Sequence, residues 1–183
     1  GTVTHRIPMG ASADPYNAST FPYGVLPSAD GKKLYVSNWK EGTLAVVDVN
    51  NPDAAAVAKT IPVGQHPNAM VFSPAGDRLY VANANSDSVS VIDTATDARL
   101  FDIDVRPYKN APFGSTPNAL AVSPDGETLY VLNAGENAVV VVELESQDKE
   151  PGKHARKRDD EKRYEVKGRI PTGWYPTALI ISP

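Results

Sequence analysis

Histidine is the residue type in this sequence that most readily moves a proton near neutral pH, and the chain has three of them. His5, His66 and His154 lie in unrelated sequence contexts, with no pair at metal-ligand spacing and no cysteine beside them. The sequence also lacks an H-E-x-x-H motif, a G-x-S-x-G elbow, a P-loop and a dinucleotide fingerprint. We therefore expect no metal site, no cofactor and no assignable catalytic residue.

A second set of candidates combines amide and aromatic side chains at the ends of short apolar runs. Loop residues of these types suit a small polar ligand or the loop of a partner protein. The expected ligand or partner face consists of Tyr23, Asn38, Trp39, His66, Asn68, Asn83, Asn85, Asn118, Asn133, Trp174 and Tyr175. The competing interpretation is that asparagine stabilises turns, and it applies most to Asn38, Asn83 and Asn133, which share one repeat position. Trp39 and His66 break the repeat pattern and are better functional candidates.

A charged insertion at 143–169 carries nine Lys or Arg and eight Asp or Glu. A segment of this composition cannot bury a core, so it predicts an exposed loop or extended hairpin. Its basic centre could contact an anionic polymer through Lys153, Arg156, Lys157 and Arg158. The acidic residues next to that centre favour a solvated loop instead. A second insertion, at 108–116, lengthens a loop on the candidate face.

The elements that position these residues come from an internal repeat. Its copies begin at Pro22, Pro67, Pro117 and Pro176, which places them 45, 50 and 59 residues apart. The first three copies each reach a Leu-Tyr-Val whose leucine lies twelve residues after the proline. Each copy predicts four short strands separated by turn residues. A repeat of this length with four strands is typical of a β-propeller.

The expected fold class is all-β, part of one propeller domain over 1–183 with four-stranded antiparallel blades. We place blades at 22–64, 67–106 and 117–173, an outer strand of a preceding blade at 5–10, and the start of a further blade at 176–183. A blade buries its faces against its neighbours, and a closed ring needs about four to eight blades. The sequence therefore predicts a part of a larger ring. The remaining blades, from the same polypeptide or another chain, are the expected partners.

The segments LYVSN, LYVAN and LYVLN are each followed by a turn and an apolar run such as LAVVDV. They resemble the YVTN-type β-propeller repeat of bacterial periplasmic and surface proteins, including lactonase-like and surface-layer propellers. The resemblance covers nearly the whole chain outside the two insertions. More narrowly, GSTPNAL and GWYPTA are similar to junctions in the N-terminal propeller of bacterial proteins that continue into an alkaline-phosphatase-like phosphoesterase domain. That resemblance implies a seven-bladed ring, an exported protein and a metal-dependent hydrolase downstream.

Composition narrows the function classes. The formal net charge is −4 and no run of eighteen apolar residues occurs, so neither nucleic acid nor a membrane span is expected. The main interpretation is a periplasmic or cell-surface binding or scaffold module, non-catalytic by itself, that presents its loop face to a ligand, a partner or a phosphoesterase domain. One alternative is a lactonase-like hydrolase with a site at the channel mouth that further blades complete. Another is polyanion or nucleic-acid binding through the 143–169 insertion.

Overall fold

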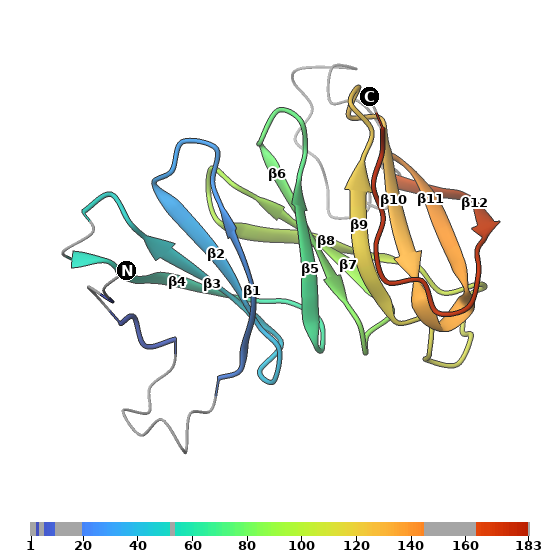
Figure 1. The fold of residues 1–183 in the computed structure, drawn as a ribbon, viewed down its shortest axis with the longest axis horizontal. Helices are drawn as coiled ribbons and strands as arrows, with labels where there is room; N and C mark the ends of the chain where they lie inside the picture. Colours follow the sequence, from blue (N-terminus) through green and yellow to red (C-terminus); the bar gives the residue numbers. More distant parts are fainter. Residues whose placement is uncertain (1–2, 4–5, 10–19, 52–53, 145–163, 183) are drawn as a thin grey trace.

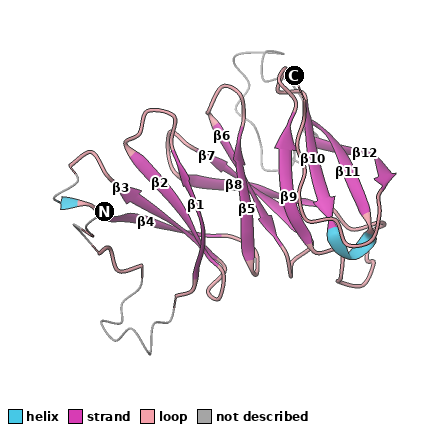
Figure 2. Cartoon of the chain, viewed as in Figure 1, coloured by secondary structure: helices cyan, strands magenta, loops and turns pink. Residues whose placement is uncertain are grey.

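The described part of the chain is built from β-strands, with only short helical turns. The computed structural model describes residues 3, 6–9, 20–51, 54–144 and 164–182. The strands form three four-stranded antiparallel sheets, each with its strands in chain order (Figures 1 and 2). The predicted fold class, a partial propeller of four-stranded blades, is confirmed. No helix among these residues is long and apolar enough to cross a membrane.

Each sheet is one blade, and its first strand is the innermost. The first blade contains β1 (Pro22–Pro27), β2 (Lys33–Asn38), β3 (Thr43–Asp48) and β4 (Ala56–Pro62). The second contains β5 (Pro67–Phe72), β6 (Arg78–Asn83), β7 (Ser88–Asp93) and β8 (Ala98–Asp104). The third contains β9 (Pro117–Val122), β10 (Thr128–Asn133), β11 (Ala138–Leu144) and β12 (Tyr164–Pro171), with a 3-10 turn, η2 (Ala134–Glu136), after β10. The innermost strands of successive blades lie next to one another (Figure 1).

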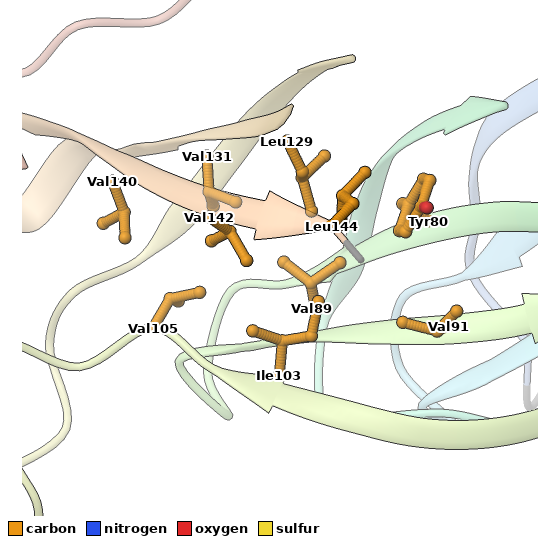
Figure 3. Packing of buried hydrophobic residues seen from close by; sticks show 10 residues of the cluster. All are labelled: Tyr80, Val89, Val91, Ile103, Val105, Leu129, Val131, Val140, Val142 and Leu144. Atoms are coloured by element: carbon orange, nitrogen blue, oxygen red, sulfur yellow. The ribbon is translucent and has the colours of Figure 1, made fainter. Parts of the chain in front are cut away.

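The core lies between the blades rather than inside any one of them. Val89 and Ile103 of the second blade face Leu129 and Val142 of the third (Figure 3). A second cluster joins the first two blades in the same way, with Leu79 of β6 among its fully buried members. Burying one such aliphatic side chain stabilises the fold by about 1.5–3 kcal/mol. The repeat is therefore written several times because a single blade has no partner for its apolar faces.

A polar contact also crosses the first blade boundary. Lys33 donates to Asp97 Oδ2 at 2.7 Å, and the Tyr35 hydroxyl donates to Asp97 Oδ1 at 2.7 Å. Burial raises the pKa of Tyr35, and the bond to the Asp97 carboxylate adds to that shift. Tyr35 therefore stays protonated and keeps its donor role. The two blades are fixed by this contact as well as by their apolar faces.

The turn between β7 and β8 depends on an ionised carboxylate. Asp93 Oδ1 accepts from the Thr96 backbone and hydroxyl, both at 2.8 Å, and Oδ2 accepts from Arg78 at 3.1 Å. The Thr96 hydroxyl is the main cause of a pKa for Asp93 below its usual value. A depressed carboxyl pKa stabilises the fold above the unfolded-state value of about 3.9, and this stabilisation is lost as pH falls through the folded pKa.

We predict a pH-dependent difference between the native protein and Asp93→Asn. At pH 6 the native protein should have the larger free energy of unfolding, because only its charged Asp93 gains from Arg78 and Thr96. Below about pH 4 the advantage should shrink, since Asp93 becomes protonated. Urea unfolding from pH 2 to pH 7 measures both. A difference between the two proteins that does not change with pH would contradict this assignment.

Three observed segments differ from the expected layout. Residues 6–9 form no strand, although Ile7 and Met9 pack on an apolar cluster of the first blade. Residues 176–182 likewise form no strand. Neither segment has a ladder partner among the described residues, and a ladder is what makes a segment a strand. The outer strand β12 starts at Tyr164, inside the segment assigned to the charged insertion, because Tyr164 and Val166 alternate toward the core.

Candidate functional site

One end of the three blades gathers both sets of candidate loops. We call it the loop end: the turns at 39–42, 84–87 and 134–137 and the linkers at 63–66, 105–116 and 172–175, along the lower side of Figure 1. Backbone bonds tie turns to linkers. Val63 donates to the Gly42 carbonyl at 2.9 Å, and Ala84 donates to the His66 carbonyl at 3.1 Å. A turn from one blade and the linker that enters the next blade therefore share one surface.

Trp39 and His66 come together at the boundary of the first two blades. Their rings stack with centroids 3.6 Å apart and an interplanar angle of 8°. Phe21 extends the cluster, since its ring lies 6.0 Å from the Trp39 ring and its carbonyl accepts from the Trp39 amide at 2.8 Å. Both stacked residues are partly exposed. The His66 side chain makes no hydrogen bond within the described residues.

The backbone at His66 has a left-handed conformation, with φ 53°. The equivalent linker residues Thr116 and Tyr175 have φ values of 51° and 43° and also precede a proline. The conformation is therefore a property of the repeat rather than strain peculiar to this site. The linkers at 63–66, 105–116 and 172–175 share this conformation, whereas Phe21, before Pro22, does not adopt it.

The asparagines at the shared repeat position are buried. Asn38, Asn83 and Asn133 are 1%, 0% and 0% exposed. Asn83 donates to Ser88 and Ser90, and Asn133 donates to the Val105 carbonyl at 2.8 Å. The structure therefore does not place these three on the exposed loop face. Each of them is the last residue of a buried strand and lies next to a turn. This position supports the interpretation that these asparagines stabilise turns.

Asn68 and Asn118 each reach from an innermost strand to the next copy of the repeat. Asn68 Nδ2 donates to the Pro117 carbonyl at 3.2 Å, and Asn118 Nδ2 donates to the Pro176 carbonyl at 3.3 Å. Each amide thus reaches the first residue of the next copy of the repeat. Tyr23 occupies the same position in the first copy and is 64% exposed. Each asparagine therefore ties one copy of the repeat to the next, whereas Tyr23 is exposed.

We predict that Asn68→Ala lowers the free energy of unfolding by about 1–2 kcal/mol, because it removes two side-chain hydrogen bonds, one to the Pro117 carbonyl and one from the Ala69 amide. The matched control is Asn85→Ala, because Asn85 is exposed and bonds only through its backbone. That change should stay within about 0.5 kcal/mol. Urea unfolding of both variants makes the comparison. Equal effects would show that the contact to Pro117 adds nothing.

The remaining candidates are spread along the loop end. Trp174 and Tyr175 are 94% and 51% exposed, and Asn85 is exposed as well. They are not in contact with the Trp39–His66 stack through any ring pair of the described residues. The proposed polyanion contacts at 153–158 lie outside the described residues.

The sequence did not reveal the polar cluster between the second and third blades. Asp87 is fully buried, and its carboxylate accepts from the amides of Gly114 at 2.7 Å and Thr116 at 2.9 Å. Glu136 pairs with Arg169 at 3.2 Å and is also hydrogen-bonded to Ser115. These contacts anchor the 105–116 linker. The sequence contains one indication of this cluster: Asp87 lies at the repeat position that Gly42 and Asn137 occupy in the other copies.

The site offers an aromatic platform, an imidazole and exposed amides. Among the described residues no group of three or more His, Cys, Asp or Glu side chains is arranged to hold a metal ion. The described side chains at the loop end can stack and form hydrogen bonds, and the His66 imidazole can accept or donate a proton.

Solved structures with the same fold include enzymes. The chain matches a hydrazine synthase of Kuenenia stuttgartiensis with 26% identity and a TM-score of 0.66, over 100% of this chain and 43% of that one. It matches a protein of Bacteroides uniformis, assigned as a 6-phosphogluconolactonase, with 16% identity and a TM-score of 0.72, over 94% and 48%. The periplasmic gluconolactonase of Pseudomonas aeruginosa matches with 22% identity and a TM-score of 0.65, over 86% and 43%. The chain thus spans less than half the length of these three structures.

No curated protein sequence gives a significant match. The family model for lactonases with a seven-bladed β-propeller matches residues 3–106, more than half of the chain. This match overturns the main interpretation drawn from the sequence, a non-catalytic binding or scaffold module, and favours the lactonase-like alternative. The scaffold interpretation was wrong because it took the lack of convergent acids and histidines as a sign that the blades are not catalytic. These blades offer a single histidine at the loop end. The chain belongs to the lactonase family of seven-bladed β-propellers.

Proposed function

We propose that this propeller hydrolyses a sugar-acid lactone at the loop end, with the Trp39–His66 stack as part of its site. The observation that carries the proposal is that the region matched by the lactonase family contains both rings, in contact at 3.6 Å. The gluconolactonase and the 6-phosphogluconolactonase among the structural relatives support a sugar-derived lactone as the substrate class. Further blades complete the channel mouth around this stack.

The chemistry of the reaction fits the residues present. Water adds to the lactone carbonyl carbon and loses a proton to a base, and a tetrahedral oxyanion forms. The acyl C–O bond of the ring then breaks, and the leaving alkoxide takes up a proton. The product is an open-chain hydroxy acid, which releases one proton as its carboxylate. In this scheme the His66 imidazole is the base, because its edge is unengaged.

Trp39 has two effects in this scheme. Its ring holds the imidazole in one plane by stacking, and its exposed part offers an apolar surface to the face of a sugar ring. Aromatic contacts of this kind are worth about 0.5–1.5 kcal/mol beyond the area they bury. The residue therefore orients both the base and the substrate.

The test is an assay of acid release from glucono-1,5-lactone and from 6-phosphogluconolactone at constant pH. We expect hydrolysis above the spontaneous rate for at least one of them, and a KM about five- to tenfold higher for Trp39→Ala, from the stacking energy above. Tyr108→Ala is the control, since Tyr108 is 66% exposed on the loop end and outside the stack. A protein that accelerates neither reaction would refute the proposal.

The cellular location of the propeller and the domains attached to it are also proposals. An extracytoplasmic site is supported by the periplasmic origin of the Pseudomonas aeruginosa gluconolactonase. A downstream phosphoesterase domain stays a prediction from the sequence, as do the blades that complete the ring. Fractionation of cells that express the full-length protein tests the location directly.

A further inference from the structure

The three turns after the second strand of each blade have one position at which the backbone is left-handed. Gly42, Asp87 and Asn137 occupy it, with φ values of 62°, 47° and 54°. In all three, the carbonyl of this residue accepts from the first amide of the linker into the next blade. The acceptor distances are 2.9 Å for Val63, 3.0 Å for Val105 and 2.8 Å for Thr172. The three turns therefore share this left-handed residue and its carbonyl bond, and they differ in the side chain at that residue.

At the second and third positions the side chain binds a linker amide. Asp87 accepts from the amide of Thr116 at 2.9 Å, and Asn137 Oδ1 accepts from the amide of Tyr175 at 2.7 Å. Both amides belong to the left-handed residue that precedes a proline. The repeat therefore includes a fixed amide donor that points over the turn, together with a side-chain oxygen that occupies it.

At the first position the donor is present and the side-chain acceptor is missing. The backbone of His66 has a φ value like those of Thr116 and Tyr175. The His66 carbonyl accepts from the Ala84 amide at 3.1 Å, just as the Thr116 carbonyl accepts from the Ala134 amide at 3.1 Å. By equivalence with Thr116 and Tyr175, whose amides bond to Asp87 and Asn137, we infer that the His66 amide is directed toward Gly42, which has no side chain to accept from it. Within the described residues the His66 amide donates no hydrogen bond. The unmatched donor belongs to the residue that stacks on Trp39.

We propose that the backbone amide of His66, above Gly42, binds the carbonyl oxygen of the lactone and stabilises the oxyanion that forms on it. The inference rests on the proposed function and adds to it a donor that is not a side chain. The equivalent amides of Thr116 and Tyr175 show what kind of group this donor binds. The first bonds to a carboxylate oxygen of Asp87, and the second bonds to the amide oxygen of Asn137. A fixed amide already aimed at an acceptor needs no reorganisation as charge develops, and one such donor is worth about 10²–10³ in kcat.

Gly42 is the one residue of the three that offers no side-chain oxygen to the linker amide. An asparagine at 42 would adopt the same backbone as Asn137 and place its own oxygen on the His66 amide. The added Cβ would lie 2.9 Å from the Gly64 carbonyl oxygen, so that carbonyl would also have to shift. Gly42→Ala makes the same contact without supplying an oxygen. The two variants therefore separate the loss of the amide from the displacement of Gly64.

The experiment compares kcat for lactone hydrolysis in Gly42→Asn and Gly42→Ala. We expect Gly42→Asn to be about 100-fold slower than Gly42→Ala, because only asparagine occupies the amide. Gly76→Asn is the control for a left-handed glycine elsewhere, since Gly76 has φ 74° and nothing within 4 Å of its added Cβ. It should keep the native rate. Equal rates for Gly42→Asn and Gly42→Ala would overturn the inference.

A second measurement needs no catalysis. Titration of the ¹⁵N-labelled protein with sodium gluconate, which carries the carboxylate of the expected product, should move the amide resonance of His66. Gly42→Asn should abolish that shift. A shift in a protein without lactonase activity would support the oxygen site and refute the proposed function. Activity without any shift of His66 would refute the oxygen site alone.

Discussion

His66→Asn is expected to lower kcat for lactone hydrolysis about a thousandfold. General-base catalysis contributes about 10²–10⁴ to enzymatic rates, and the imidazole is the group that supplies it in the proposed reaction. Asparagine is chosen because it tolerates the left-handed backbone that this position requires, with φ 53°. The backbone amide is kept, so the loss reports on the side chain alone. Initial rates of acid release under saturating lactone give the value.

Two controls accompany this measurement. The midpoint of thermal unfolding should stay within a few degrees of the native value, since the His66 side chain makes no hydrogen bond in the described residues. Thr116→Asn changes the equivalent residue of the next linker and should keep the native kcat. A rate for His66→Asn within threefold of the native rate would remove His66 from the proposed mechanism.

Leu79→Ala is expected to lower the free energy of unfolding by about 3–4 kcal/mol. Leu79 is 0% exposed in the cluster between the first and second blades, where Tyr35 and Leu44 pack from the other sheet. A leucine-to-alanine change in such a core loses the transfer energy of the methyl groups and leaves a cavity, which costs about 2–5 kcal/mol. Urea unfolding followed by far-ultraviolet circular dichroism measures the change.

The repeat supplies the matched control for that experiment. Leu34 holds the same position in the first copy but is only partly buried, because no blade of the described chain covers it. Leu34→Ala should therefore cost about half as much or less. Leu100→Ala, on the outer strand β8 and 43% exposed, should cost less than about 1 kcal/mol. Equal losses at Leu34 and Leu79 would contradict the claim that blade-to-blade packing holds the structure together.

Local sequence was sufficient for the strands and turns. Each copy of the repeat predicts four short strands, and in the second copy these are β5, β6, β7 and β8. Pro62 lies in β4, an outer strand, where a proline is tolerated because one side of the strand forms no ladder. These features succeed because side-chain alternation, turn chemistry and proline geometry act within a few residues.

Contacts across blade boundaries were harder to predict. Trp39 and His66 were singled out because they break the repeat, but their stacking was not foreseen. The inter-blade bond of Asn68 and the buried carboxylate of Asp87 were also missed. In each case the partner comes from another blade, and its position depends on how the blades pack. The sequence did not predict the start of β12, because charged residues alternate there with Tyr164 and Val166, the two side chains that pack on the core.

The sequence by itself determined that the chain is all-β, that it repeats one four-stranded unit, and where most strands lie, because these depend on periodicity and turn residues. The tertiary structure decided which loop residues share a surface. It buried Asn38, Asn83 and Asn133, joined Trp39 to His66, and left the His66 amide without a hydrogen-bond partner among the described residues. The physical reason is that a propeller brings residues together through the packing of neighbouring sheets, and that packing is fixed only when the apolar faces of the blades meet.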